Sequence, residues 1–266
     1  QLTVQVPDNI ENLVTFKITD TPCIGITDSI KNMTIVNGAG TKLAVKTDYS
    51  VTATSATSTT GTGFELTFAN TKPSTIKKIA GQTLTIEYEA YLNKDAVIAG
   101  VGNVNTAKLD YSWKASNPDT TEDPQYTITD EAVVYTYQFD LQKYLDKTGN
   151  ANKAPKGIEF ELYRETVDKT GNTVQEIMKI TQDTNNVYRP IDQTETPSKP
   201  ATVLVTDASG KISVKGLGQG TYYLKEIKTT DGYNLLSDDY EFKIVVTEAT
   251  TWKESTSFKD LNKGTA

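Results

Sequence analysis

The sequence predicts an all-β protein built from two consecutive β-sandwich domains. Threonine is its commonest residue and it holds 14 tyrosines, and such enrichment in β-branched and aromatic residues favours strands. Apolar residues recur at every second position in short segments, and no long apolar stripe follows the helical period. A length of 266 residues fits two ordinary domains or one large one.

A change in composition indicates the boundary between the domains. Residues 114–131 contain two prolines and many acidic residues but few apolar ones, which is typical of a segment that joins domains. We therefore assign residues 1–117 to a first domain, residues 118–131 to a junction and residues 132–266 to a second domain.

The first domain contains a series of segments with strand-like alternation. In the first of them, Phe16, Ile18 and Asp20 share one face. Further strands are expected at residues 43–49, 64–68, 83–91 and 106–113. Residues 52–63, which are rich in Thr, Ser and Gly, are expected to form a flexible surface loop or hairpin.

The second domain repeats this pattern of short strands and turns. Strands are expected at residues 133–141, 157–164, 201–206, 211–215, 221–227, 240–247 and 254–261. Strands that recur every 8–12 residues or so, with turn residues between them, are typical of a β-sandwich.

Composition excludes several classes of function. Without histidine the chain can hold neither a Ser-His-Asp nor a Cys-His site, and a lone cysteine, Cys23, can form neither an internal disulfide nor a zinc knuckle. A net charge of −7 argues against nucleic acid or an anionic membrane as partner. We expect no metal, no cofactor and no membrane contact. No signal peptide is present, so a secreted protein would be seen here in a mature or trimmed form.

Loops that could bind ligands are better explained as turns. Residues 216–220 (GLGQG) lie between two predicted strands and lack the Gly-Lys-Ser/Thr of a phosphate loop, so we interpret them as a hairpin turn. Residues 146–150 and 168–172 (both DKTGN) lack the glutamate that completes a calcium loop, and we interpret them as turns. The 34 acidic residues are scattered over polar strand faces, as on a solvated surface.

Three polar residues lie on the apolar face of their predicted strands. Lys143 continues the apolar face of residues 139–141, and Glu226 continues that of residues 221–227. Asn262 shares the face of an apolar neighbour near the end of the chain. A buried lysine or glutamate is costly unless it is paired or neutralised. Alternation leaves two interpretations open, a buried cluster or side chains that reach solvent at strand ends.

Several segments of the second half resemble one family. Residues 216–233 (GLGQGTYYLKEIKTTDGY) resemble the E-box of Gram-positive pilins and of collagen-adhesin B-type (CnaB) domains, with aspartate in place of the usual proline before Gly-Tyr. Residues 139–143 and 156–163 resemble the opening strands of that family, and residues 262–264 resemble the segment ahead of a sortase sorting signal. The resemblance covers most of residues 132–263.

The resemblance implies a specific chemistry for the three polar residues. Domains of this family form a spontaneous Lys–Asn isopeptide bond with the help of a buried acid. Carried over, Lys143 is the nucleophile, Asn262 the electrophile and Glu226 the proton shuttle. An apolar pocket favours a neutral amine and a neutral acid, which can then attack and polarise the amide. Each bond forms once, so the protein is not an enzyme.

The first half is similar to a CnaA-like pilin domain. Residues 16–21 (FKITDT) match a strand of that family, and residues 92–97 and 102–112 match its last part. The resemblance implies two tandem Ig-like β-sandwich domains and makes Asp20 the buried acid of the first.

The isopeptide site of the first domain can be assigned only in part, because its lysine is not identified in this chain. Alternation favours Asn105 as the acceptor, because Asn105 shares a face with Leu109, and Asn103 is the alternative. The family places the lysine well upstream of the acid, and Lys17 lies on the wrong face. We therefore expect the first strand and its lysine to be missing from this chain.

The resemblance implies a structural shaft subunit, the major or backbone pilin, of an extracellular pilus anchored to the cell wall. Its partners would be other pilin subunits joined by sortase, with host surface or matrix as a further partner. One alternative is an ancillary pilin, or the stalk of a cell-wall adhesin, that binds host matrix. An enzyme is a second alternative, which would need a cleft with converging carboxylates.

Overall fold

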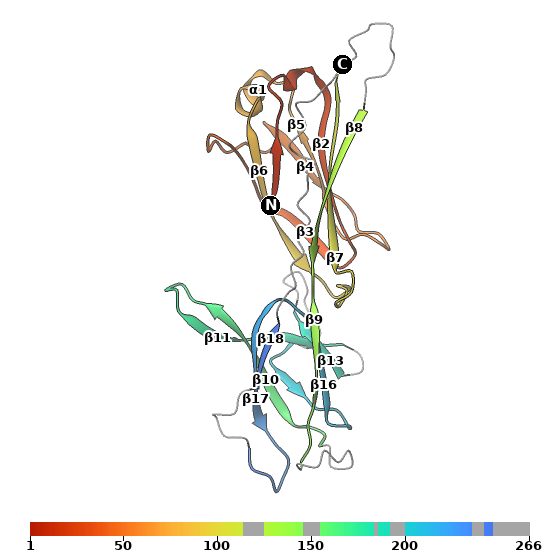
Figure 1. The fold of residues 1–266 in the computed structure, drawn as a ribbon, viewed down its shortest axis with the longest axis vertical. Helices are drawn as coiled ribbons and strands as arrows, with labels where there is room; N and C mark the ends of the chain where they lie inside the picture. Colours follow the sequence, from red (N-terminus) through yellow and green to blue (C-terminus); the bar gives the residue numbers. More distant parts are fainter. Residues whose placement is uncertain (114–124, 146–154, 184–185, 192–199, 236–241, 247–266) are drawn as a thin grey trace. The chain divides into compact units, whose positions relative to one another are not determined.

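A computed structural model describes residues 1–113, 125–145, 155–183, 186–191, 200–235 and 242–246. The described chain divides into two compact units, which we treat separately (Figure 1). Within the described ranges, unit 1 comprises residues 1–95 and 103–134, and unit 2 comprises residues 96–102 and 135–250.

Unit 1 consists of two facing β-sheets. Its elements are β1 (Leu2–Gln5), η1 (Ile10–Asn12), β2 (Leu13–Pro22), β3 (Ile26–Asn37), β4 (Tyr49–Ala53), β5 (Phe64–Phe68), α1 (Pro73–Ile79), β6 (Thr83–Leu92), β7 (Asn103–Trp113) and β8 (Gln125–Val134). One sheet has the strand order β1-β6-β3 and the other has the order β4-β5-β2-β7-β8, and the recorded pairings are antiparallel.

The core of unit 1 lies between these sheets. Ile86 of β6 belongs to the same buried cluster as Ile18 of β2 and Leu109 of β7, and each of these three residues is at most 2% exposed. Aromatic rings extend the cluster, since the Phe64 and Tyr88 rings meet edge to face at 4.9 Å. Alternation along each strand is what brings these residues to one side.

Unit 2 also consists of two facing sheets. Its strands are β9 (Tyr137–Gln142), β10 (Glu159–Val167), β11 (Thr173–Ile177), β12 (Ile180–Gln182), β13 (Val187–Pro190), β14 (Pro200–Ala201), β15 (Val203–Val205), β16 (Lys211–Leu217), β17 (Gly220–Lys228) and β18 (Phe242–Val246). One sheet has the order β11-β10-β17-β18, with β15 also paired to β10, and the other has the order β14-β12-β13-β16-β9. The hairpin of β10 and β11 projects from the rest of unit 2 in Figure 1.

The core of unit 2 joins residues from both sheets. Phe160 of β10 and Tyr222 and Leu224 of β17 pack with Ile212 and Val214 of β16, and each is at most 1% exposed. The all-β sandwich predicted from the sequence is therefore confirmed in both units. Within the described ranges, no helix combines the length and apolar character needed to cross a bilayer.

The strand expected at residues 43–49 is wrong. This segment is a turn that leads into β4, with Lys46 at a positive φ of 64°. The buried Asp48 carboxylate accepts a hydrogen bond from the Ala44 backbone N–H at 2.8 Å, which folds the segment back on itself. A local side-chain bond thus overrides the alternation of the sequence.

The single strand expected at residues 133–141 is two strands in the structure. β8 ends at Val134 and pairs with β7 in unit 1, whereas β9 begins at Tyr137. Between them, the buried Thr136 donates its hydroxyl to the Val97 carbonyl oxygen at 2.8 Å and accepts the Ala99 N–H. The junction expected at residues 118–131 therefore overlaps a strand of unit 1.

The turns predicted at glycine- and aspartate-rich motifs differ in outcome. Residues 216–220 do not close a hairpin, because β16 pairs with β9 and β13 while β17 pairs with β10 and β18. They carry the chain from one sheet to the other, with Gly216 at a φ of 74°. Residues 168–172 do form a turn, in which Asp168 accepts the Thr170 and Asn172 N–H groups. Residues 146–150 and 254–261 lie outside the described residues.

Candidate functional site

Among the described residues of unit 2, the most deeply buried acid is Glu226. It lies on β17 opposite Phe160 of β10, and it continues the inward face of Tyr222 and Leu224. The residue is 3% exposed. A carboxyl group taken this far from water needs a partner of opposite charge, or a proton of its own.

Lys143 supplies the partner. It follows directly after β9, and its backbone N–H bonds to the Gly210 carbonyl oxygen at 2.9 Å. The ammonium Nζ lies 2.7 Å from Oε2 of Glu226, and the two side chains are 20% and 1% exposed. Because β9 and β17 belong to different sheets, this contact links the two layers of the sandwich from within.

One atom of this site lacks a partner. Oε1 of Glu226 is buried and accepts no hydrogen bond from the described residues. A carboxyl group with one oxygen on an amine and the other free can pass a proton between two neighbouring groups. Asn262, the third residue expected here, lies outside the described residues, so the structure brings together two of the three.

Unit 1 contains a comparable acid at Asp20. This residue of β2 is 0% exposed, and Tyr88 of β6 donates its hydroxyl to Oδ2 at 3.0 Å. Nδ2 of Asn105, on β7, lies 3.1 Å from Oδ1 and 3.0 Å from Oδ2. Strands from both sheets thus contribute to this site, as they do in unit 2.

The geometry separates the two candidate acceptors of unit 1. Asn105 contacts Asp20, and its own Oδ1 is buried without a partner among the described residues. Asn103 is fully buried, but its Nδ2 bonds to the Val134 carbonyl oxygen at 3.2 Å, and its Oδ1 lies 3.9 Å from Sγ of Cys23. The structure therefore brings Asn105, and not Asn103, to the acid.

Lys17 points away from this site. Its ammonium pairs with Oε2 of Glu65 at 3.1 Å, and both side chains are at least 32% exposed. Sequence alternation had placed Lys17 on the face opposite Asp20, and the strand pairing of β2 with β5 agrees with that placement.

Two further members of the unit 1 site were not identified from the sequence. Tyr88 lies in the strand predicted at residues 83–91 but was given no role, and Asp28 was not selected at all. Asp28 is 6% exposed and neither of its oxygens has a hydrogen-bond donor among the described residues. The available signal was the alternation of Ile26 and Asp28, both of which are buried on β3.

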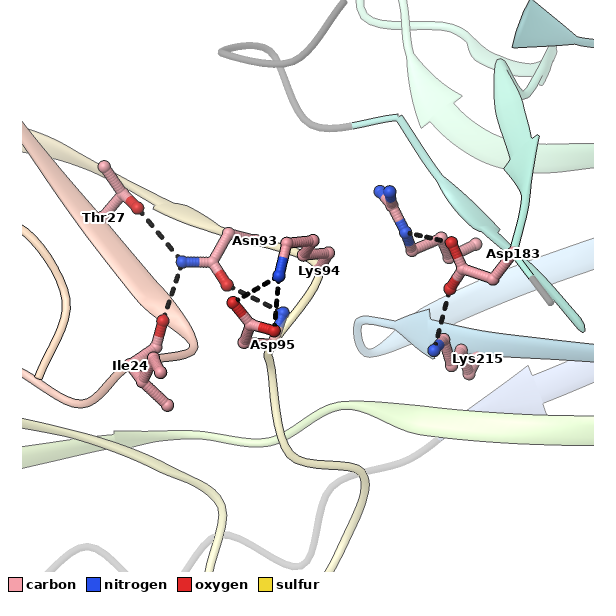
Figure 2. A network of polar contacts seen from close by, with 8 residues as sticks. Ile24, Thr27, Asn93, Lys94, Asp95, Asp183 and Lys215 are labelled. Carbon is pink, nitrogen blue, oxygen red and sulfur yellow. Dashed lines mark hydrogen bonds and ion pairs between the residues drawn. The ribbon is translucent and has the colours of Figure 1, made fainter. Parts of the chain in front are cut away.

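Other polar clusters of the molecule have ordinary structural explanations. Figure 2 shows Asp183 of unit 2 with Lys215, whose Nζ lies 2.8 Å from Oδ2, and Arg189 Nε lies 3.1 Å from Oδ1. Burial works to raise the pKa of Asp183, but the hydrogen bonds and charges of Lys215 and Arg189 outweigh it and hold that pKa below its ordinary value. This acid is ionised and paired, unlike Asp28.

A second cluster in Figure 2 belongs to unit 1 and fixes a turn. Asn93 donates from Nδ2 to the Ile24 carbonyl oxygen at 2.8 Å and to the Thr27 hydroxyl at 3.1 Å, and it accepts the Asp95 N–H. Among the described residues, no three acidic or cysteine side chains are grouped so as to hold a metal ion.

An open groove of about 440 Å³ lies in unit 1 between the edge strand β1 and the inner face of β7. Leu2, Val4, Ile18 and Leu109 line it with apolar side chains. Ile18 lies two residues before Asp20 on β2, so the groove follows the same inward face that carries the acid.

Comparison with known proteins places these features in a family context. The model of the family described as SpaA, prealbumin-like fold domain, matches residues 142–261. The chain is 26% identical over 182 residues to fimbrial subunit type 1 of Actinomyces viscosus, covering 63% of this chain and 33% of that protein. It is 25% identical over 195 residues to the trypsin-resistant surface T6 protein of Streptococcus pyogenes serotype M6, covering 68% and 30%. The chain thus spans about a third of the length of these relatives.

Solved structures of pilins share the fold. A 35 kDa C-terminal fragment of a major pilin of Streptococcus agalactiae matches with a TM-score of 0.64 at 22% identity, over 91% of this chain and 82% of the fragment. The full-length major pilin SpaD of Corynebacterium diphtheriae matches with a TM-score of 0.55 at 18% identity, over 90% and 53%. The chain is therefore similar in sequence to a fimbrial subunit and to a surface T6 protein and shares the fold of solved major pilins, and its residues 142–261 match the SpaA prealbumin-like fold domain.

Proposed function

We propose that this chain is part of the shaft subunit of a Gram-positive surface pilus, where it serves as a force-bearing structural module. Its relatives are fimbrial and surface proteins, and both units are sandwiches of the kind found in major pilins. In this proposal the partners are other pilin subunits joined by sortase, the location is the cell wall and its exterior, and no catalytic turnover is involved.

The proposal extends to a covalent bond inside unit 2. Lys143 Nζ attacks Cγ of Asn262, so that a new N–C bond forms, the bond from Cγ to Nδ2 breaks, and ammonia leaves. Glu226 takes a proton from the amine and delivers it to the leaving nitrogen. The observation that carries this step is the 2.7 Å contact between Lys143 and a Glu226 side chain that is 1% exposed.

The contact is suited to the first proton transfer. An ammonium and a carboxylate at this distance, away from water, can exchange one proton to give a neutral amine and a neutral acid. The amine is then nucleophilic, and the free Oε1 of Glu226 is available to the amide. Holding the reactants together turns a slow amide exchange into an intramolecular step.

The bond would have a mechanical purpose. It would join the segment after β9 to the end of the chain, and a disulfide that closes a loop of about 100 residues contributes roughly 4.7 kcal/mol by chain entropy. More important, tension between these two points would pass through a covalent bond and not through the hydrogen bonds of the sheets.

The same reaction is proposed for unit 1, with Asp20 as the acid and Asn105 as the acceptor. The contacts of Asp20 with Asn105 and Tyr88 support these roles. The amine is assigned to a lysine outside the described residues, because Lys17 is committed to Glu65. The groove beside β1 would receive the strand that carries that lysine.

Intact mass tests the bond of unit 2. The purified chain should weigh less than its sequence by one ammonia. Glu226→Ala should restore the calculated mass, because the proton shuttle is lost. A wild-type chain at its full calculated mass would remove the bond from the proposal.

A matched control comes from another lysine pair of unit 2. Lys215→Met removes one of the two cationic partners of Asp183 but leaves Lys143 and Glu226 in place. This variant should keep the mass deficit. A deficit lost in both variants would show that the loss reflects general disruption of unit 2.

A further inference from the structure

The hydroxyl of Tyr88 contacts both the acid and the amide of the reaction proposed for unit 1. It donates to Oδ2 of Asp20 at 3.0 Å, and it accepts an N–H from Nδ2 of Asn105 at 3.2 Å. Nδ2 of Asn105 also lies 3.1 and 3.0 Å from the two oxygens of Asp20. The three groups therefore form a closed triangle of hydrogen bonds, in which Asp20 and Asn105 come from one sheet and Tyr88 comes from the other.

The triangle determines which end of the Asn105 amide faces the acid. The two N–H groups of the amide meet three acceptor oxygens, two on Asp20 and one on Tyr88. The amide oxygen, Oδ1, is buried and has no partner among the described residues. Rotation of the amide by half a turn would place Oδ1 against the acceptor oxygens of Asp20 and would remove the N–H donors from the triangle. The nitrogen that leaves in the proposed reaction is thus the atom that the acid contacts.

Packing holds the Tyr88 ring in place. The pairing of β6 with β3 is interrupted between Ser29 and Thr34, and Tyr88 lies on β6 at that interruption. Irregularities of this kind re-aim side chains and are common next to active sites. The ring of Phe64, which lies opposite Asp20 in the pairing of β2 with β5, meets the Tyr88 ring edge to face at 4.9 Å. Phe64 is itself 0% exposed, so the hydroxyl extends across the sandwich from a well-packed ring.

The Tyr88 hydroxyl keeps its proton. Burial, followed by the charges of Asp20 and Asp28, raises the pKa of this hydroxyl above its ordinary value, and the hydrogen bond to Asp20 acts in the same direction. The hydrogen bond from Asn105 acts in the opposite direction and does not outweigh them. A neutral hydroxyl can donate one proton and accept another group's N–H at the same time, and both contacts of Tyr88 require this.

We propose that Tyr88 is a further residue of the unit 1 reaction site, where it orients the Asn105 amide with its leaving nitrogen on Asp20. This inference rests on the reaction proposed for unit 1 for its chemical purpose. The orientation itself depends only on the contacts within the triangle, and it can be tested without the reaction.

The orientation decides which step Asp20 assists. As the amine nitrogen bonds to Cγ of Asn105, the bond from Cγ to Nδ2 breaks, the amine gives up one proton and the departing ammonia gains one. Asp20 takes that proton and delivers it to Nδ2, which lies 3.1 and 3.0 Å from its oxygens. Because the acid contacts the nitrogen and not Oδ1, it assists the departure of ammonia and does not polarise the carbonyl group. Asp20 and Tyr88 end with the protons with which they began.

Nuclear magnetic resonance of the full chain tests the orientation. In the wild type, the side-chain N–H groups of Asn105 should exchange slowly with solvent, and Nδ2 should show scalar coupling to Cγ of Asp20 through the hydrogen bond. Tyr88→Phe keeps the ring but removes the oxygen, so exchange at Asn105 should accelerate about tenfold and the coupling should weaken. A wild-type chain without this coupling, or unchanged exchange in Tyr88→Phe, would overturn the proposal.

Two controls separate orientation of the amide from general loosening of unit 1. Tyr91→Phe removes another hydroxyl from β6, one that donates to a glutamate at the protein surface, and it should leave the exchange rate at Asn105 unchanged. The side-chain amide of Asn103, which donates to a backbone carbonyl oxygen of β8, should exchange at the same rate in the wild type and both variants. Faster exchange at Asn103 in Tyr88→Phe would show that the hydroxyl only supports the fold.

Methylamine, a small substitute for the lysine amine, tests the role of Tyr88 in the reaction. In the wild type it should replace the side-chain nitrogen of Asn105 with release of ammonia, which peptide mapping by mass spectrometry detects. Tyr88→Phe should lower the yield about tenfold, whereas Tyr91→Phe should not. Equal yields in the wild type and Tyr88→Phe would overturn this role. A wild-type chain that takes up no methylamine at Asn105 would overturn the reaction proposed for unit 1, while the resonance measurements would still decide the orientation.

Discussion

The acid sites of the two units satisfy a buried carboxyl group in different ways. In unit 2, Glu226 has a lysine ammonium at 2.7 Å. In unit 1, Asp20 has the Asn105 amide and the Tyr88 hydroxyl, and its further neighbour is a second acid, Asp28. One site contains its own cation, and in the other a carboxyl group must keep a proton.

This difference shows how much of each reaction centre is in place. The site of unit 2 holds the amine and the acid, so its proton can move along one short hydrogen bond. The site of unit 1 holds the acid and the amide, and three buried oxygens, on Asp28 and Asn105, are without donors from the described residues. An amine that entered this site would donate hydrogen bonds to these unpaired oxygens.

The largest effect is expected from breaking the site of unit 2. Glu226→Ala leaves the Lys143 ammonium, whose side chain is only 20% exposed, without its counter-ion, and the cost of about 3–5 kcal/mol for an uncompensated buried charge is an upper bound here. Loss of the proposed covalent bond would add to that cost. Hydrogen exchange of the peptides that contain β10 and β17 should therefore accelerate strongly, while the peptides of unit 1 remain protected.

Glu226→Gln sharpens this result. The amide keeps the shape and some of the hydrogen bonding of the glutamate but cannot shuttle a proton, so stability should fall less than in Glu226→Ala while the mass still lacks the ammonia deficit. Unchanged exchange of β17 in both variants would mean that the Lys143–Glu226 contact contributes nothing to the stability of unit 2.

An intermediate effect is expected from pH in unit 1. Asp28 has an ordinary pKa of 3.8 when unfolded and one of about 9 when folded. Between these values the folded unit holds a proton that the unfolded chain has lost, so stability falls as pH rises, by up to about 1.4 kcal/mol per pH unit. Urea midpoints of unit 1, followed by hydrogen exchange across this range, should decrease in the wild type and stay flatter in Asp28→Asn.

Asp48 is expected to change the stability of unit 1 with pH in the direction opposite to Asp28. Burial works to raise its pKa, but the Ala44 N–H, Lys78 and Thr75 outweigh it and hold the pKa below its ordinary value. Its contribution is therefore present above the unfolded pKa and is lost as pH falls through the folded one. Asp48→Asn should reduce the loss of stability of unit 1 at low pH but keep the loss of stability as pH rises. If this variant removed both pH dependences, the assignment of the second one to Asp28 would be contradicted.

The sequence was sufficient for the fold class and for the inward face of most strands. Alternation correctly placed Asp20 and Glu226 among buried residues, because successive side chains of a strand point to opposite faces and a half-buried strand therefore has an apolar residue at every second position. It failed at residues 43–49, where the Asp48 side chain bonds to Ala44 and makes a turn. It also failed at Thr136, where bonds to residues 97 and 99 interrupt an apparent strand.

The composition of the sites was harder to predict than their location. Asp28 reaches the site from β3, in the sheet that faces Asp20, and nothing local in the sequence reports which residue lies across the sandwich. The choice between Asn103 and Asn105 could not be made from the sequence for the same reason, because both residues lie on one face of β7. Only the position of β2 relative to β7 separates them, because Asn105 lies opposite Pro22, two residues beyond Asp20.

The smallest effect is expected at Lys17, the surface counterpart of Lys143. Its ion pair with Glu65 is solvent-exposed, and such pairs contribute about 0–1 kcal/mol. Lys17→Met should therefore shift the urea midpoint of unit 1 only slightly, with no change in mass and a reduced dependence of that midpoint on salt. A loss of several kcal/mol would show that Lys17 is engaged inside the sandwich, and unit 1 would then contain its own amine as unit 2 does.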